Sequence, residues 1–257
     1  MKAAWLAAGA VATAIALVIS SMLLWRGFAR ARMPTENSQK SIALGAKNVR
    51  IKVGKGSQVD LMLLPGQAGT LLIERSLRWS SDRPNATETW DARSGTLRLD
   101  AACSDDHGTP VCQAEYVVFV PPETDIEAST TTGELAVNEV FGNVRLSSVS
   151  GVIRAEGISG SLWARTGTGN VDASGLDSDR ADVEVGSGEV SLSFVNAPTA
   201  VKAVVRTTGN VDVTVPTAAY QVMADGHSTN VDVKQNPESS RKIVAKAPRG
   251  IVSICCQ

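Results

Sequence analysis

Between Pro122 and the C-terminus, apolar and polar residues alternate in short phrases, and each phrase opens with a turn residue. The positions two and four residues after that opening are apolar in the segments 133–137, 169–173 and 209–213. Because side chains alternate between the two faces of a strand, this pattern predicts strands with one buried face and one polar face. Glycine opens most of the phrases and supplies the backbone freedom that a tight corner needs.

The opening glycines recur at a regular interval. Between positions 133 and 169 they stand nine residues apart. Every second phrase continues one register to the C-terminus, with the opening residues Gly133, Gly151, Gly169, Gly188, Gly209, Thr229 and Gly250. A step of about 20 residues containing two strands and two turns is one coil of a flattened solenoid, and stacked coils share a continuous core. The chain is therefore predicted to be all-β, a single-stranded β-solenoid (flattened β-helix). A β-sandwich of paired hairpins is the alternative, but it does not account for the regular spacing.

The part of the chain before Pro122 alternates less regularly. The short two-periodic segments are 49–53, 58–63, 70–74, 96–99 and 116–120, and each is bounded by turn residues. They predict strands. We expect one β-solenoid domain over residues 46–257, less regular over 46–122 and regular over 123–257. The polar and charged stretch 26–45 is predicted to be a linker.

Residues 3–25 contain no charged side chain. A helix needs about 20 such residues to cross the hydrocarbon core of a bilayer, and Trp5 and Trp25 lie where interfacial aromatic residues are found. We expect an N-terminal transmembrane helix within residues 1–25. A signal segment cleaved after Ala31 is the alternative.

Two signals disagree about the side of the membrane. Three arginines follow the apolar segment and only Lys2 precedes it, which favours a cytoplasmic domain. Cys103 and Cys112 flank a turn-like segment, which favours a disulfide in an oxidising compartment. We expect a single-pass membrane protein with its domain on the extracytoplasmic side, or a secreted domain after cleavage.

The composition limits the function classes. The net charge of -1 gives no bias toward nucleic acid, so no nucleic-acid partner is expected. Aromatic residues make up only 4% of the chain, and small aliphatic residues suit the narrow interior of stacked short strands.

The repeated phrase resembles a bacterial putative-adhesin family, a membrane-anchored domain of unknown function with Ser/Thr-Gly-Asp-Val repeats. The matching phrases begin at Thr132, Thr168, Ser187 and Thr208. The segment from Trp79 to Pro122, with its cysteine pair, also resembles the segment that precedes the repeats in this family. The resemblance covers roughly residues 45–257, and it implies a β-solenoid at the cell surface with no catalytic residues.

This sequence departs from the family pattern after the glycine, where asparagine replaces aspartate. The positions are Asn143, Asn170, Asn210 and Asn230. Stacked asparagine side chains can hydrogen-bond along a ladder, whereas stacked aspartates would repel one another. We predict that these four residues form a structural ladder.

The strand aspartates Asp172, Asp212 and Asp232 are the candidates for a cation site or for catalysis. Calcium-binding β-rolls need Gly-Gly-x-Gly-x-Asp loops, which are missing from these turns. In the predicted register Asp212 and Asp232 occupy neighbouring coils, and Arg154 beside Asp172 reads as an ion pair between coils. A solvated polar face is the simpler interpretation, so no catalytic, cofactor or metal site is predicted.

A few other side chains are candidates. Trp163 takes an outward position, where it could contact a sugar or a partner, or be covered by the 174–180 segment. His107 between the two cysteines could add a zinc ligand, but a fourth ligand is missing and a disulfide is preferred. Cys255, predicted to point outward from the last edge strand, could join two copies of the chain, while Cys256 is predicted to point inward.

These observations together predict a non-catalytic, adhesin-like binding or scaffold protein of the bacterial cell envelope. Its expected partner is a surface polysaccharide or an envelope protein. A sensory module of envelope-stress signalling is the alternative, and a glycan-acting β-helix enzyme is a third candidate.

Overall fold

A computed structural model describes residues 15, 17–25, 33–45, 47–54, 59–80, 83–102 and 111–256. The chain divides into two units, Met1–Thr35 and Glu36–Gln257. In the first unit, residues 17–25 are helical. Within the described part of the chain, no helix has both the length and the apolar character needed to cross a membrane. The predicted anchor lies mostly outside the described residues, so it remains a prediction.

The second unit is built from strands. Those of its N-terminal part are β1 (Thr35–Ala43), β2 (Asn48–Val53), β3 (Val59–Pro65), β4 (Thr70–Trp79), β5 (Asn85–Asp91), β6 (Thr96–Ala102) and β7 (Cys112–Val120). The repeats begin with β8 (Asp125–Thr132), β9 (Leu135–Asn138), β10 (Val144–Ser150), β11 (Ile153–Glu156), β12 (Leu162–Thr168), β13 (Val171–Leu176) and β14 (Arg180–Ser187). They end with β15 (Val190–Phe194), β16 (Ala200–Val205), β17 (Val211–Val215), β18 (Ala219–Asp232), β19 (Lys234–Gln235) and β20 (Lys242–Cys256).

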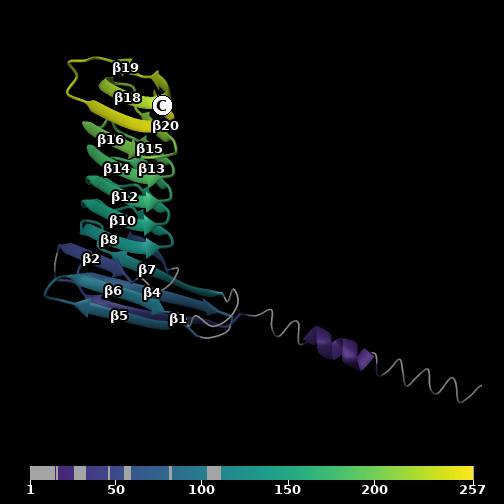
Figure 1. The fold of residues 1–257 in the computed structure, drawn as a ribbon. Coiled ribbons are helices and arrows are strands. Elements are labelled where there is room, and N and C mark those ends of the chain that lie inside the picture. Colours follow the sequence, from purple (N-terminus) through teal and green to yellow (C-terminus); the bar gives the residue numbers. More distant parts are fainter. Residues whose placement is uncertain are drawn as a thin grey trace, which may run out of the picture. The chain divides into compact units, whose positions relative to one another are not determined.

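The repeats form two stacks of parallel strands, and Figure 1 shows the rungs following one another from β8 to β16. The first stack contains β2, β8, β10, β12, β14, β16 and the first half of β20. The second contains β3, β9, β11, β13, β15, β17 and the second half of β20. Each coil therefore contributes one strand to each stack, and the predicted all-β solenoid is confirmed.

The alternating apolar positions point into a narrow core between the stacks. Val171 and Ala173 are each 1% exposed, and their neighbours Ile153 and Ala155 on the preceding rung are equally buried. At the second corner of the coil, an apolar residue such as Ile158 closes the interior with no exposed surface. No coil could bury these side chains alone, so burial depends on the neighbouring rungs.

The corner glycines between the stacks are required by close contact between rungs. Gly169 has a φ of +127°, and a Cβ atom there would lie 2.2 Å from the carbonyl oxygen of Gly151. A Cβ atom at Gly250 would lie only 1.8 Å from the carbonyl oxygen of Gly209. A side chain at either position would push two rungs apart.

The N-terminal end of the solenoid carries two antiparallel pairs, β4 with β7 and β5 with β6. β1 pairs with β4. The side chain of Arg75, 13% exposed, bonds Glu88 at 2.9 Å and Glu36 at 3.1 Å. The predicted linker 26–45 is therefore wrong for residues 35–43, where alternating polar residues form β1 on the edge of this layer.

The C-terminal end does not follow chain order. β20 pairs with β16 and β17 on one side and with β18 on the other, so the last strand in sequence lies between earlier ones. The corner residue that stacks on Gly209 must lack a Cβ atom. Gly250 meets this condition, whereas Thr229 does not. The predicted neighbours Asp212 and Asp232 are consequently separated: Asp212 is in register with Ser253, and Asp232 with Cys255.

This order also corrects the predictions for the two terminal cysteines. Cys255 does not lie on an unpaired edge strand, because β20 is paired on both sides. It is half-buried, with its sulfur 3.5 Å from Thr214 Oγ1. Cys256 is exposed rather than inward-pointing, because it ends the strand beyond the buried Ile254. The reason for expecting a dimer through Cys255 is therefore removed.

Candidate binding groove

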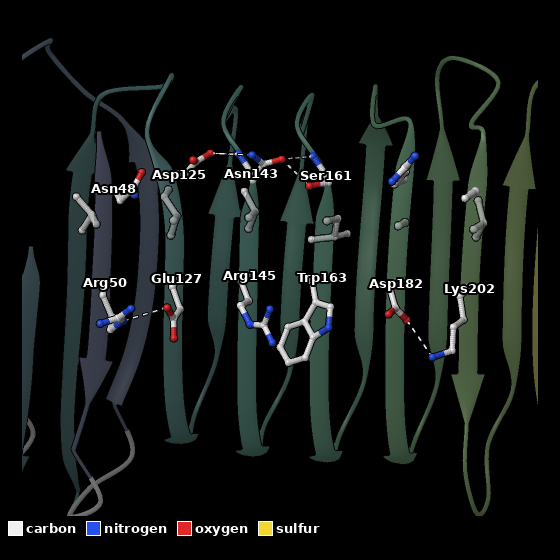
Figure 2. Close-up of a pocket in the computed structure, with 18 of the residues that line it drawn as sticks. Asn48, Arg50, Asp125, Glu127, Asn143, Arg145, Ser161, Trp163, Asp182 and Lys202 are labelled. Atoms are coloured by element: carbon white, nitrogen blue, oxygen red, sulfur yellow. Dashed lines mark hydrogen bonds and ion pairs between the residues drawn. The ribbon is translucent and has the colours of Figure 1, made fainter. Parts of the chain in front are cut away.

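The outer face of the first stack carries two rows of side chains that run along the stacking direction (Figure 2). In-register parallel pairing places equivalent residues of successive strands side by side. One row consists of Arg50, Glu127, Arg145, Trp163, Asp182, Lys202 and Val244. The other row lies two residues earlier on each strand and consists of Asn48, Asp125, Asn143, Ser161, Arg180, Ala200 and Lys242.

A groove of about 820 Å³ lies between these two rows. Its floor is the backbone of the inward-facing residues between them, for example Val144 and Leu162. The lining reaches from β2 to β20 in the first stack, and at about 4.8 Å per strand these six intervals span roughly 29 Å. The shape is suited to a linear ligand that lies across the strands.

Most carboxylates in the groove are paired with a cation. Arg50 Nε lies 2.9 Å from Glu127 Oε2. Asp182 lies between two cations, 2.8 Å from Arg165 Nη2 and 3.4 Å from Lys202 Nζ. Their charges are largely neutralised within the protein, so they add little net potential to the groove.

Three cations of the groove are not neutralised in this way. Within the described ranges, no carboxylate lies at ion-pair distance from Arg145, Arg180 or Lys242. All three side chains are exposed. They give the groove a positive character that the net charge of the chain does not reveal.

Trp163 stands at the middle of the groove, on β12. The guanidinium carbon of Arg145 lies 3.8 Å from the ring centroid, and that of Arg165 lies 4.5 Å away. Cation–π contacts of this kind hold an arginine in place over the indole. Trp163 therefore orients Arg145 toward the groove and is not a bare stacking platform for a sugar.

The toastrack domain family DUF4097 matches residues 75–254. The chain belongs to this family. Its repeats were thus correctly related to a domain of unknown function. The comparison with curated proteins finds no match.

Several solved structures are similar to this toastrack chain. A putative cell adhesion protein from Clostridium sporogenes is 12% identical, covers 87% of this chain and 100% of its own, and has a TM-score of 0.39. A putative adhesin from Bacteroides fragilis is 11% identical over 85% of this chain and 97% of its own, with a TM-score of 0.45. A putative lipid binding protein from Parabacteroides distasonis is 12% identical over 85% and 96%, with a TM-score of 0.43. Identities and TM-scores this low carry no ligand over to this chain.

The four predicted ladder asparagines lie in different places in the toastrack domain. Asn143 lies in the groove, where its Nδ2 donates to Asp125 Oδ1 at 3.0 Å and its Oδ1 accepts from Ser161 N at 3.1 Å. Asn170 and Asn210 lie in the second stack, each one residue after a corner glycine.

The asparagines of the second stack bond backbone groups of the next rung rather than one another. Asn170 Oδ1 accepts from Glu189 N, and Asn210 Oδ1 accepts from Ile251 N, both at 3.0 Å. Asn230 is in register with Ser253. The expected stacking of asparagine on asparagine is wrong. The rung that carries Glu189 separates Asn170 from Asn210, and β20 separates Asn210 from Asn230.

The outer face of the second stack carries the strand aspartates. Ser191 lies between Asp172 and Asp212 in the register of successive strands, so the two carboxylates are not adjacent. Arg154, although in register with Asp172, forms its ion pair with Glu134. Among the described residues, no group of three or more His, Cys, Asp or Glu side chains could hold a metal ion.

The predicted disulfide and zinc alternatives fall partly outside the described residues. Cys103 and His107 lie there, whereas Cys112 begins β7. The pairing of Cys103 with Cys112 remains a prediction. The sequence singled out only Trp163 and Asn143 among the groove residues, because the groove exists only once strands from distant parts of the chain are placed in register.

Proposed function

We propose that this toastrack chain is a non-catalytic, adhesin-like binding protein of the bacterial cell envelope, and that its groove holds a linear anionic polysaccharide. The single observation that carries the proposal is the set of three unneutralised cations, Arg145, Arg180 and Lys242, along one elongated groove. A linear polymer can contact all three at once, whereas a small anion contacts only one.

The expected strength of each contact is modest. Exposed ion pairs contribute about 0.2–1 kcal/mol each, so a single sugar should bind weakly. Several contacts on one chain act together through effective concentration, and a polymer can therefore bind much more tightly than its units. Shared weak contacts of this kind suit adhesion to an extended surface.

The carboxylates of the groove support binding rather than hydrolysis. A glycosidase needs one carboxyl group that stays protonated as a general acid and a second that acts as nucleophile or base. Glu127 on β8 and Asp182 on β14 each form an ion pair with a cation of the protein. Three strand intervals, roughly 14 Å, separate these two carboxylates, which is more than the roughly 9.5 Å between the two carboxyl groups of a glycosidase.

The location of the protein is part of the proposal. The apolar segment 3–25 anchors the chain in the bacterial cell membrane, and the domain stands on the extracytoplasmic side with Cys103 paired to Cys112. Support comes from the length of the apolar segment and from the cysteine pair in the sequence. Labelling of the exposed Cys256 on intact cells with a membrane-impermeant maleimide tests the orientation, and labelling only after lysis would contradict it.

The binding proposal is tested by titrating the purified full chain with polygalacturonate, a linear acidic polysaccharide, and with neutral dextran. We expect salt-sensitive binding of the first and none of the second. Arg145→Gln should weaken binding about twofold to fivefold. Arg154→Gln, which removes the same charge from the other stack, should leave it unchanged.

Equal effects of the two substitutions, or no binding of any acidic polysaccharide, would overturn the proposal. Specific crosslinking of one membrane protein on intact cells, without polysaccharide binding, would instead favour the sensory module.

A further inference from the structure

The three groove cations without an ion pair recur at every second strand of the first stack. In the strand order β2, β8, β10, β12, β14, β16, β20, Arg145 lies on β10, Arg180 on β14 and Lys242 on β20. Two intervals of about 4.8 Å separate the strands that carry successive cations by roughly 10 Å. The Arg145 guanidinium leans from β10 toward β12, where it lies 3.8 Å from the centroid of the Trp163 ring. Arg145 lies on one wall of the groove, and Arg180 and Lys242 lie on the other.

The strands between these cations offer no free charge. β12 contributes Ser161 and Trp163 to the groove. β16 contributes Ala200 and Lys202, and the lysine lies 3.4 Å from Asp182. The groove therefore alternates between a charged and a neutral strand from β10 to β20.

We propose that the groove selects a polysaccharide in which an acidic sugar alternates with a neutral sugar, so that one negative charge meets each free cation. This inference rests on the proposed function and names the class of polymer. A spacing of roughly 10 Å, two strand intervals, is about the length of a disaccharide. The neutral sugars then lie over β12 and β16, beside Trp163 and Ala200.

The same spacing gives other linear polyanions fewer matched contacts per charge. A DNA strand carries a charge about every 3.4 Å, so only about every third phosphate would face a cation in the groove. An extended peptide presents side chains on one face about every 6.8 Å, twice the rise per residue. Its acidic groups could meet the two outer cations but would be out of step with the middle one.

The test compares two probes of equal charge on the full chain. A hyaluronan hexasaccharide carries three carboxylates, one on every second sugar, and trigalacturonate carries three on adjacent sugars. The two outer carboxylates of trigalacturonate can match two cations and its middle one matches none, so the hexasaccharide makes one more matched contact. The hexasaccharide should therefore bind about twofold to fivefold more tightly than trigalacturonate. Affinity should also rise in steps from the hyaluronan disaccharide to the tetrasaccharide and the hexasaccharide.

A gain-of-function variant tests the spacing independently of folding losses. Ser161→Arg places a cation on the neutral strand β12, between Arg145 and Arg180. It should raise the affinity for trigalacturonate by about twofold to fivefold and change that for the hyaluronan hexasaccharide much less. Arg154→Gln serves as the unchanged control.

The outcomes separate the two proposals. Equal affinity for both probes, with both weakened by Arg180→Gln, would overturn the alternating-charge inference and leave the binding groove standing. No binding of either probe, or binding that Arg145→Gln and Arg180→Gln leave unchanged, would overturn the proposed function as well.

Discussion

Two glycines of the solenoid have positive φ but differ in the space around them. Gly157, with φ +64°, leaves room for a Cβ atom, since the nearest heavy atom would be Glu139 Cγ at 3.5 Å. Gly169, with φ +127°, leaves none, because its Cβ atom would lie 2.2 Å from Gly151 O. Substituting alanine at each position separates the cost of the backbone conformation from the cost of close rung contact.

The expected costs follow from these distances. Alanine in the left-handed conformation at Gly157 should cost about 1 kcal/mol, because about 1–2 kcal/mol of strain is offset in part by the less flexible unfolded chain. At Gly169 the φ of +127° lies outside the left-handed region, and alanine held in that conformation costs about 1–3 kcal/mol. The clash also strains the bonds from Gly151 N to Thr168 O and from Gly169 N to Ser187 O, at 2.9 and 3.0 Å. Weakening both adds about 1–2 kcal/mol, so the total is roughly 2–5 kcal/mol.

Urea unfolding of the purified full chain, followed by circular dichroism, measures both costs. With a slope of about 2 kcal/mol per M, Gly157→Ala should lower the midpoint by about 0.5 M. Gly169→Ala should lower it by about 1–2.5 M with the same slope. Equal midpoints for the two variants would show that backbone freedom alone, without close contact between rungs, selects glycine at the corner.

Three further predictions concern other parts of the chain. Burial raises the pKa of Tyr116 to about 12, so the neutral phenol stabilises the fold fully below pH 10 and this contribution is lost as the pH rises through 12. Between pH 9 and pH 12, the free energy of unfolding of the wild type in urea should fall by about 2–3 kcal/mol more than that of Tyr116→Phe. Equal falls would contradict this prediction. In a background with Cys255→Ser and Cys256→Ser, the pair Asp212→Cys and Ser253→Cys should form a disulfide on oxidation, because these residues are register partners. The pair Asp212→Cys and Asp232→Cys should not form one. The reverse result in non-reducing peptide maps would mean that the last rungs stack in chain order. A Cys103–Cys112 bond should appear in the non-reduced peptide map of the exported chain, and its reduction should cost about 2 kcal/mol of stability; two free thiols there would remove the prediction.

The regular part of the fold could be predicted because its causes are local. Period-two alternation identifies inward residues such as Val171 and Ala173, and the recurring glycines set the register between rungs. The strand β1 was missed because its polar alternation lies on an edge and buries little apolar surface. Sequence alone does not distinguish such a strand from a linker.

The order of the last rungs was missed although the sequence contains a signal for it. The phrases that open at Thr229 and Gly250 look equivalent by their apolar pattern. Only the glycine can approach Gly209 O, which decides which rung stacks there. The presence or absence of a Cβ atom at the corner is therefore more informative than the order of the phrases along the chain.

The groove could not be predicted, because its residues are isolated in sequence and belong to strands that use most of the chain. Arg145 and Arg180 are ordinary surface arginines until the register sets them two strands apart. Their free charge depends on which neighbouring carboxylates are already paired, as Asp182 is with Arg165. Such pairing is a property of the assembled face.

Arginine footprinting shows whether the groove of the first stack is the binding surface. The full chain is treated with an arginine-specific reagent with and without the hyaluronan hexasaccharide, and the modification of each arginine is measured by mass spectrometry. We expect the ligand to protect Arg145 and Arg180 and to leave Arg154 on the second stack unchanged. Protection of Arg154 with continued modification of Arg145 and Arg180 would contradict this expectation.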